Sequence, residues 1–236
     1  LATMRFFLAI SLLCCYFCCQ AQQKYALIVA IADYPKESGW NSIHSDNDLQ
    51  LLVPQFKRLG FQINTLIDKQ ATKKNITQDL QDLIRQLNPG DDVCLHFSCH
   101  GQQMEDDNGD EADGLDEALI PYDARKTFQK GIYEGEKHLR DDELEKYLTC
   151  IRQKTGANGS VLVTFDACHS GTANRIEEYV EDEDAPIRGT NVIFTSNPFY
   201  IAPDAKHIQR KNRLMQQSGL SPICIISACQ PFQRNF

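Results

Sequence analysis

The sequence predicts an α/β fold with a mostly parallel β-sheet and helices on both of its faces. Three observations support this fold class. The chain of 236 residues is long enough to bury one α/β core. Continuous apolar runs with β-branched residues, which are typical of strands buried on both faces, recur along it. Segments with the apolar spacing of helices lie between these runs, and such alternation indicates parallel strands joined by helical crossovers.

The first half of the chain contains three predicted strands and two predicted helices. Each strand is a short apolar run, and each helix has apolar residues every three or four positions. In chain order they are the strand Lys24–Ala32, the helix Asp46–Leu59, the strand Phe61–Ile67, the helix Thr77–Leu87 and the strand Asp92–Ser98. Thr77 is the expected N-cap of the second helix, and Pro89 and Gly90 follow its end.

The second half is less regular. A long acidic loop is expected after Ser98, followed by a helix at Asp141–Lys154 and a strand at Val161–Phe165. Beyond it the pattern dissolves over about 45 residues, in which only Asn191–Thr195 is strand-like. Long irregular stretches in a compact domain are usually functional or disordered. A further buried strand is expected at Pro222–Cys229.

The first 23 residues are typical of a secretory signal peptide. A basic residue, Arg5, precedes fourteen apolar residues, and cleavage is expected near Ala21. This apolar run is too short for a stable membrane span, so we expect a secreted or periplasmic protein. Residues 1–3 precede the first methionine and are expected to lie upstream of the true start. The remaining residues, 24–236, form one expected domain, and we expect that it continues beyond position 236.

Charge and cysteine content narrow the function classes. The formal net charge is -8, which argues against a nucleic-acid partner because such proteins normally carry a basic patch. Six cysteines remain after the predicted signal peptide. They are too few for a disulfide scaffold and lack the paired spacing of zinc ligands.

Two predicted strands end in residues that suit nucleophilic catalysis. "VCLHFSCHG" ends in His100 and Gly101, and "VLVTFDACHSG" contains Cys168. Ligands bind beyond the carboxyl ends of parallel strands, so neighbouring strands would bring His100 and Cys168 together. His100 could then activate the thiol, and the amides of Gly101 and Cys168 could stabilise an oxyanion. The alternative is that Cys168 is a small buried hydrophobic residue.

The motifs "HFSCHG" (96–101) and "DACHSG" (166–171) resemble the two active-site motifs of caspase-like cysteine peptidases of clan CD. Together with "NSIHSDNDLQLL" (41–52), they are most similar to metacaspases and bacterial metacaspase-like proteins. The resemblance implies a caspase-like three-layer sandwich. It also implies that His100 is the general base, that Cys168 is the nucleophile, and that peptide bonds are cleaved through a thioester.

The residues around the cysteine predict a basic substrate preference. Asp166 stands two residues before Cys168, and with Asp48 it would make the S1 pocket negative. Such a pocket pairs with Arg or Lys and rejects Asp, so the expected partners are peptides or proteins with exposed Arg or Lys. By resemblance Ser98 is a smaller contributor to this pocket. The alternative for Asp48 is a helix cap or an acid in the first turn of a helix.

The acidic stretch Glu105–Asp123 does not match the EF-hand register, because Glu111 stands where glycine is required. By composition alone it could equally be a solvated loop. The resemblance makes Asp116, Asp141 and Asp142 candidate calcium ligands. A further family ligand after the cysteine motif has no acidic equivalent, since Asn174 and Arg175 stand there. We therefore expect no cofactor for the chemistry itself, with calcium as a candidate activator.

Arg188 in "APIRGT" is the expected site of self-processing, because it precedes a glycine in an irregular stretch. Three other functions stay open on the sequence. The chain could be a caspase-fold interaction module, a calcium-binding protein in which Cys168 is structural, or a legumain- or gingipain-type peptidase.

Overall fold

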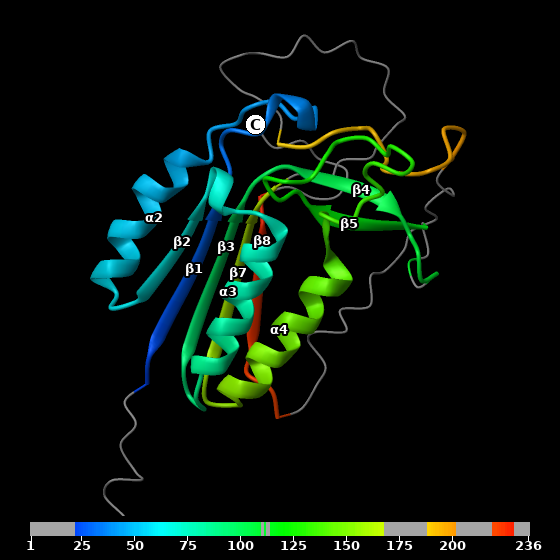
Figure 1. The fold of residues 1–236 in the computed structure, drawn as a ribbon. Coiled ribbons are helices and arrows are strands. Elements are labelled where there is room, and N and C mark those ends of the chain that lie inside the picture. Colours follow the sequence, from blue (N-terminus) through cyan, green and yellow to red (C-terminus); the bar gives the residue numbers. More distant parts are fainter. Residues whose placement is uncertain (1–21, 110, 112–113, 168–187, 202–218, 229–236) are drawn as a thin grey trace, which may run out of the picture.

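The main sheet of the computed structural model has five parallel strands (Figure 1). The structure describes residues 22–109, 111, 114–167, 188–201 and 219–228. The strands lie in the order β2-β1-β3-β7-β8. Their bounds are β1 Lys24–Ala30, β2 Gln62–Ile67, β3 Asp92–Ser98, β7 Ser160–Asp166 and β8 Ile223–Ser227. The predicted α/β class is thereby confirmed.

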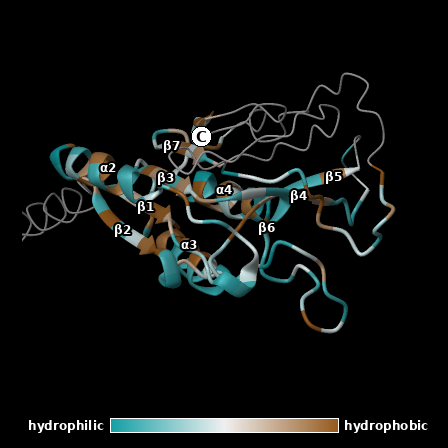
Figure 2. Ribbon diagram, turned by 90° about the horizontal axis from the view of Figure 1, so that it is seen from above, coloured by the Kyte–Doolittle hydropathy of each residue, from teal (hydrophilic) through white to brown (hydrophobic). Residues whose placement is uncertain are grey.

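Helices cover both faces of this sheet. They are α2 (Asp46–Arg58), α3 (Lys73–Gln86) and α4 (Asp141–Thr155), and there are short 3-10 turns at Lys36–Ser38 and Asp68–Gln70. The crossovers β1-α2-β2 and β2-α3-β3 run in opposite directions across the sheet, so their helices lie on opposite faces. Figure 2, seen from above, shows α2 and α3 on opposite sides of the strands. The result is a three-layer arrangement.

A continuous apolar core fixes the positions of the strand ends. Leu27, Val29 and Phe97 from β1 and β3 are almost fully buried. Leu80 of α3 and Ile151 of α4 reach the same core. Each such side chain stabilises the fold by about 1.5–3 kcal/mol. Because β1, β3 and β7 are held in register by this core, the residues that follow them start from fixed points.

A second, antiparallel sheet was not predicted. It contains β4 (Gly101–Glu105), β5 (Leu115–Leu119) and β6 (Leu139–Arg140), in that order. The prediction of a long acidic loop after Ser98 is therefore wrong at both β4 and β5. The cause is that β5, "LDEAL", buries two acidic residues, Asp116 and Glu117, which in sequence look solvated.

The start of α3 also differs from the prediction. The helix begins at Lys73, and its N-cap is Thr72, whose hydroxyl accepts a hydrogen bond from the Asn75 amide at 3.2 Å. Thr77, the expected cap, lies inside the helix, where its hydroxyl donates to the Lys73 carbonyl at 3.0 Å. Either Thr72 or Thr77 could cap a helix by residue type, and the structure uses the earlier one.

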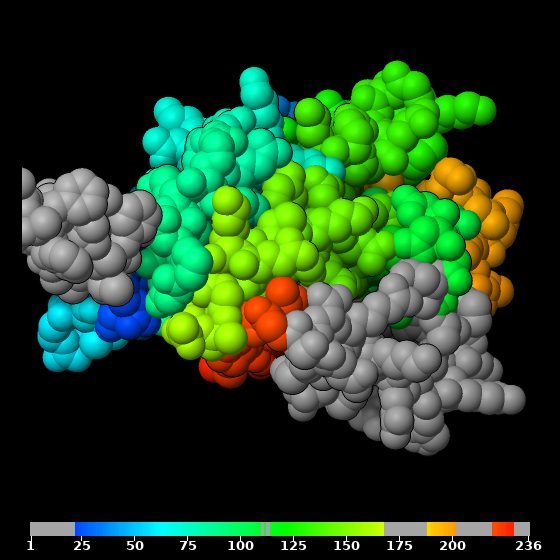
Figure 3. Space-filling view, turned by 90° about the horizontal axis from the view of Figure 1, so that it is seen from below, coloured from blue at the N-terminus to red at the C-terminus, as the bar shows by residue number. Residues whose placement is uncertain are grey.

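The last two predicted strands also need correction. β8 pairs with β7 but is not buried, and Ile226 is 54% exposed. In the space-filling view the segment around β8 reaches the surface beside α4 (Figure 3). Asn191–Thr195 is not a strand, since it makes only one isolated bridge, between Phe194 and Met104. Among the helices that the structure describes, none is both long and apolar enough to cross a membrane.

Candidate active site

His100 lies immediately beyond β3 and is held on several sides. Its backbone N–H donates to the Tyr34 hydroxyl at 3.1 Å. Its ring stacks on Trp40, with centroids 4.7 Å apart. Its Nε2 lies 2.8 Å from the carbonyl oxygen of Asn41, and the side chain is 2% exposed. These contacts fix the ring in one orientation.

The contact with Asn41 determines which nitrogen of His100 carries the proton. A carbonyl oxygen only accepts, so Nε2 must carry the hydrogen and the lone pair of the neutral ring is on Nδ1. Nδ1 is buried and has no hydrogen-bond partner among the described residues. Burial lowers the pKa of His100 to about 4. The ring is therefore a neutral base at neutral pH. None of the described residues donates a hydrogen bond to its basic nitrogen.

Cys168, the predicted nucleophile, lies outside the described residues. The chain leading to it is described as far as Ala167, which is buried. β3 pairs with β7 up to Ser98 and Asp166. His100 and Cys168 each follow that pair by two residues, so the two predicted catalytic residues belong to neighbouring strands. Their roles stay predictions.

Two of the predicted S1 residues, Ser98 and Asp166, contact the side chain of Arg188. Its guanidinium donates to the hydroxyls of Ser98 at 2.8 Å and Ser45 at 3.0 Å. It also lies 3.2 Å from Oδ2 of Asp166. Arg188 is only 7% exposed although it carries a charge. A pocket with one carboxylate and two hydroxyls thus holds a basic side chain of the same molecule.

The backbone of Arg188 is placed as well as its side chain. Its carbonyl oxygen accepts a hydrogen bond from the N–H of Gly101 at 3.0 Å. Gly101 is the residue whose amide was expected to stabilise an oxyanion. The carbonyl oxygen of the Arg188–Gly189 bond therefore lies on the amide that is predicted to stabilise the oxyanion. That amide belongs to Gly101, the residue after His100.

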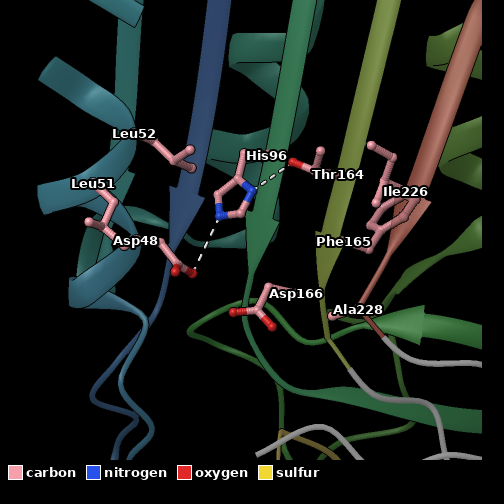
Figure 4. Close-up of a pocket in the computed structure, with 9 residues that line it drawn as sticks. All are labelled: Asp48, Leu51, Leu52, His96, Thr164, Phe165, Asp166, Ile226 and Ala228. Carbon is pink, nitrogen blue, oxygen red and sulfur yellow. Dashed lines mark hydrogen bonds and ion pairs between the residues drawn. The ribbon is translucent and has the colours of Figure 1, made fainter. Parts of the chain in front are cut away.

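Asp48 lies behind this pocket in the first turn of α2. Burial opposes its ionisation, but hydrogen bonds from His96 and Ser98 prevail and lower its pKa to about 2. Asp48 and Asp166 line a hollow of about 270 Å³ (Figure 4). Asp48 is therefore ionised and adds a second negative charge beside Asp166.

Ser45 was missed by the sequence analysis. It stands at the N-cap position of α2, yet its side chain makes no capping hydrogen bond there and instead accepts one from Arg188. The signal that could have identified it is its spacing in "HSDND", three residues before Asp48, which places both near one side of the helix start.

The residues after Arg188 continue along β4. We call Arg188–Phe194 the docked segment. Gly189 forms an isolated bridge with Gly101, and the side-chain amide of Gln102 donates to the Val192 carbonyl at 2.9 Å. The segment ends at Phe194, which is 4% exposed. Phe194 packs against the rings of Phe128, Tyr133 and His138.

The acidic residues of the loop after β4 gather near β5. Asp106, Asp107 and Asp116 bring carboxylate oxygens within 4.8 Å of one another. Arg140 pairs with Asp116 and lies 3.5 Å from Asp107. The other oxygen of Asp116 is buried without a partner among the described residues, and burial raises the pKa of this carboxyl to about 6.

The other two candidate calcium ligands lie at the start of α4. Burial and the neighbouring Asp116 raise the pKa of Asp141 to about 7. Asp142 accepts a hydrogen bond from the Asn108 amide. Carboxylate oxygens are the ligands that a hard divalent cation prefers. The carboxylates that come together as such a set are Asp106, Asp107 and Asp116, and Arg140 already neutralises part of this cluster. Asp141 and Asp142 are not part of it.

Comparison with known proteins shows the family of the chain. The fold is that of a caspase-like α/β protein. A family model described as "Metacaspase, peptidase C14 domain" matches residues 52–176. The chain belongs to this metacaspase family. It is 35% identical over 161 residues to Metacaspase-2 of Arabidopsis thaliana, covering 64% of this chain and 35% of that protein.

A second curated relative and a solved structure are also similar to the chain. Metacaspase-1B of Neurospora crassa is 36% identical over 104 residues, which is 44% of this chain and 22% of that protein. A crystal structure of a protein from Geobacter sulfurreducens has a TM-score of 0.63 at 24% identity, covering 90% of this chain and 75% of that chain, and supports the fold. The matched regions span about a third or less of these two curated relatives.

Proposed function

We propose that this protein is a cysteine endopeptidase that cleaves peptide bonds after Arg or Lys. The observation that carries the proposal is the position of Arg188. Its guanidinium lies between Asp166, Ser98 and Ser45, and its carbonyl oxygen lies on the Gly101 amide. A peptidase substrate needs both contacts at once, with its P1 side chain in a pocket and its carbonyl on an oxyanion donor.

The proposed reaction uses His100 and Cys168. Nδ1 of His100 takes the thiol proton of Cys168, and the thiolate attacks the P1 carbonyl carbon. The carbonyl oxygen becomes negative and is stabilised by the N–H of Gly101. The C–N bond then breaks, the amine leaves with the proton from His100, and a thioester remains. Water activated by His100 attacks the thioester, which releases the acid and restores the thiol.

The charge of the pocket supports the proposed specificity. Asp166 in the pocket and Asp48 behind it bring two carboxylates, which attract a guanidinium or ammonium group. An Asp side chain at P1 would meet like charges that cost several kcal/mol. The two hydroxyls of Ser45 and Ser98 fit the several N–H donors of Arg better than the compact ammonium of Lys. We therefore expect Arg to be preferred over Lys.

Calcium is proposed as an activator and not as part of the chemistry. Asp116, Asp141 and Asp142 would hold the ion, with Asp106 and Asp107 beside them. When bound, calcium would supply positive charge that keeps these carboxyls ionised. Asp116 pairs with Arg140 and lies in β5, which pairs with β4, so the charge of this cluster bears on the strand that contacts the docked segment.

The test compares fluorogenic peptides that differ only at P1. The Arg and Lys peptides should be cut, and the rate with calcium should differ from the rate without it. The Asp peptide should not be cut. Cys168→Ala and His100→Ala should each remove nearly all activity, since removal of one member of a nucleophile–base pair costs about as much as removal of both. Efficient cleavage after Asp would contradict the specificity. Activity that survives Cys168→Ala would contradict the mechanism and favour a binding role.

A further inference from the structure

His96 lies behind the S1 pocket and outside the proposed chemistry. It stands on β3, two residues before Ser98, and is 7% exposed. Figure 4 shows its ring between Thr164 of β7 and Asp48 of α2. Nδ1 lies 2.7 Å from the Thr164 hydroxyl, and Nε2 lies 3.4 Å from Oδ2 of Asp48. A buried ring with both nitrogens engaged in this way has one defined orientation.

The hydroxyl of Thr164 can serve two protonation states of His96. In the neutral state the hydroxyl donates to Nδ1, and Nε2–H points at Asp48. In the charged state Nδ1–H donates to the hydroxyl oxygen, and the hydroxyl proton turns toward the Leu95 carbonyl, 3.4 Å away. In both states Nε2–H faces the carboxylate of Asp48. The ring can therefore gain a proton without losing either contact.

The charges near His96 would respond to this proton. They are Asp48 from α2, Asp166 from β7 and Arg188 from the docked segment. Two carboxylates and one guanidinium leave one net negative charge in the occupied pocket. A charged His96 ring would cancel it, and in the empty pocket it would remove half of the attraction for a basic side chain. His96 pairs with Asp48 and Arg188 pairs with Asp166, so the ring and the P1 cation contact carboxylates that line the same hollow.

We propose that His96 is a positioning residue of the S1 pocket, which orients Asp48 and weakens the binding of a basic P1 side chain when its ring gains a proton. The inference rests on the proposed preference for Arg and Lys, and it adds a pH dependence to that preference. Affinity for a basic group should therefore fall as the pH falls.

The test measures binding of n-butylguanidine, an analogue of the Arg side chain, by NMR titration from pH 8 to pH 5.5. The background variant carries Cys168→Ala, so that nothing is cut, and Arg188→Ala, so that the pocket is empty. Two substitutions are then compared with this background. His96→Gln can keep a donor near Asp48 but cannot be charged, whereas His96→Ala loses both properties. Over this range His100 stays neutral and Asp48 stays ionised, since their pKa values are about 4 and about 2.

In the background variant the dissociation constant should rise about threefold to tenfold from pH 8 to pH 5.5. This is the size of effect expected when a charged His96 ring repels the bound guanidinium from the other side of one carboxylate. His96→Gln should bind as the background does at pH 8 and show no such rise, while His96→Ala should bind more weakly at pH 8. The same rise in His96→Gln as in the background would overturn the role of His96 alone. Absence of binding at every pH would also overturn the acidic S1 pocket and its preference for basic groups. Thermal melting of each variant checks that it is folded.

Discussion

At the scale of single residues, Asp166 is the proposed S1 acid that contacts a basic side chain directly. It ends β7, and its Oδ2 lies 3.2 Å from the guanidinium of Arg188. Ser98 and Ser45 share that guanidinium but bring no charge. Asp166 stands two residues before Cys168, so the pocket acid and the proposed nucleophile come from the same short stretch of chain.

Replacement of Asp166 should measure how much its charge contributes to the cleavage of a P1 Arg peptide. Asp166→Asn keeps the shape of the side chain but removes its charge, and we expect kcat/KM for a P1 Arg peptide to fall about 30-fold, or about 2 kcal/mol. The side chain is 22% exposed, so a larger loss is not expected. Asp79→Asn, on α3 and away from the site, is the matched control and should change kcat/KM less than twofold. An equal loss in both variants would argue against a specific role for Asp166.

At the scale of elements, the sequence predicts the large sheet better than the small one. β1, β3 and β7 are long apolar runs buried by the core, so their pattern reports their structure directly. β4, β5 and β6 are held by pairing with one another across many residues, and their own residues are polar or few. Local pattern carries no information about such pairing. β8 looked buried because its residues are apolar, but burial also depends on what covers a strand.

The candidate site likewise contains residues that the sequence predicts and residues that it does not. His100, Gly101, Asp48, Ser98 and Asp166 follow or flank the predictable strands and helix, and they could be named in advance. Ser45 could not, because a serine before a helix is more often a cap. Nor could the docking of Arg188, since contact between residues 90 positions apart, such as Arg188 and Ser98, depends on the tertiary fold.

The docked segment is anchored at its far end by the packing of Phe194, and Gly135 is the sensitive point. Gly135 has a φ of +100°, and a Cβ there would lie 2.8 Å from Phe194 Cε1 and 3.0 Å from Met104 Cε. Gly135→Ala should therefore destabilise the protein by about 1–3 kcal/mol and displace Phe194. The measurement is urea unfolding, together with limited trypsin digestion after Arg188.

Gly131→Ala provides the matched control for that substitution. Gly131 has a φ of +74° but nothing within 4 Å of an added Cβ, so only the backbone cost of about 1 kcal/mol applies. Faster trypsin cleavage after Arg188 is expected in Gly135→Ala but not in Gly131→Ala. Equal behaviour of the two variants would mean that Phe194 packing does not hold the segment.

At the scale of the whole molecule, the docked segment links the two sheets through the site. Arg188 contacts residues at the ends of β3 and β7 in the large sheet, whereas Val192 and Phe194 contact β4 of the small one. The Arg188–Gly189 bond thus lies between two anchors of the docked segment. One anchor is the side chain of Arg188 in its pocket, and the other is the ring of Phe194 in its packing site. The self-processing that we propose would cut the chain between them.

Self-cleavage at this bond should be intramolecular, because Arg188 already lies in the pocket of its own molecule with its carbonyl on Gly101. A reaction within one molecule gains from prepaid orientation and does not depend on encounters. The first-order rate constant should therefore be unchanged over a hundredfold range of protein concentration, and a new N-terminus should appear at Gly189. Calcium near 1 mM should accelerate the reaction if the Asp116 cluster binds it. Arg188→Lys should be cut more slowly, while Arg188→Ala and Cys168→Ala should stay intact at this bond. A rate that rises in proportion to concentration would show that one molecule cuts another, and the docked segment would then be a surface that must open before cleavage.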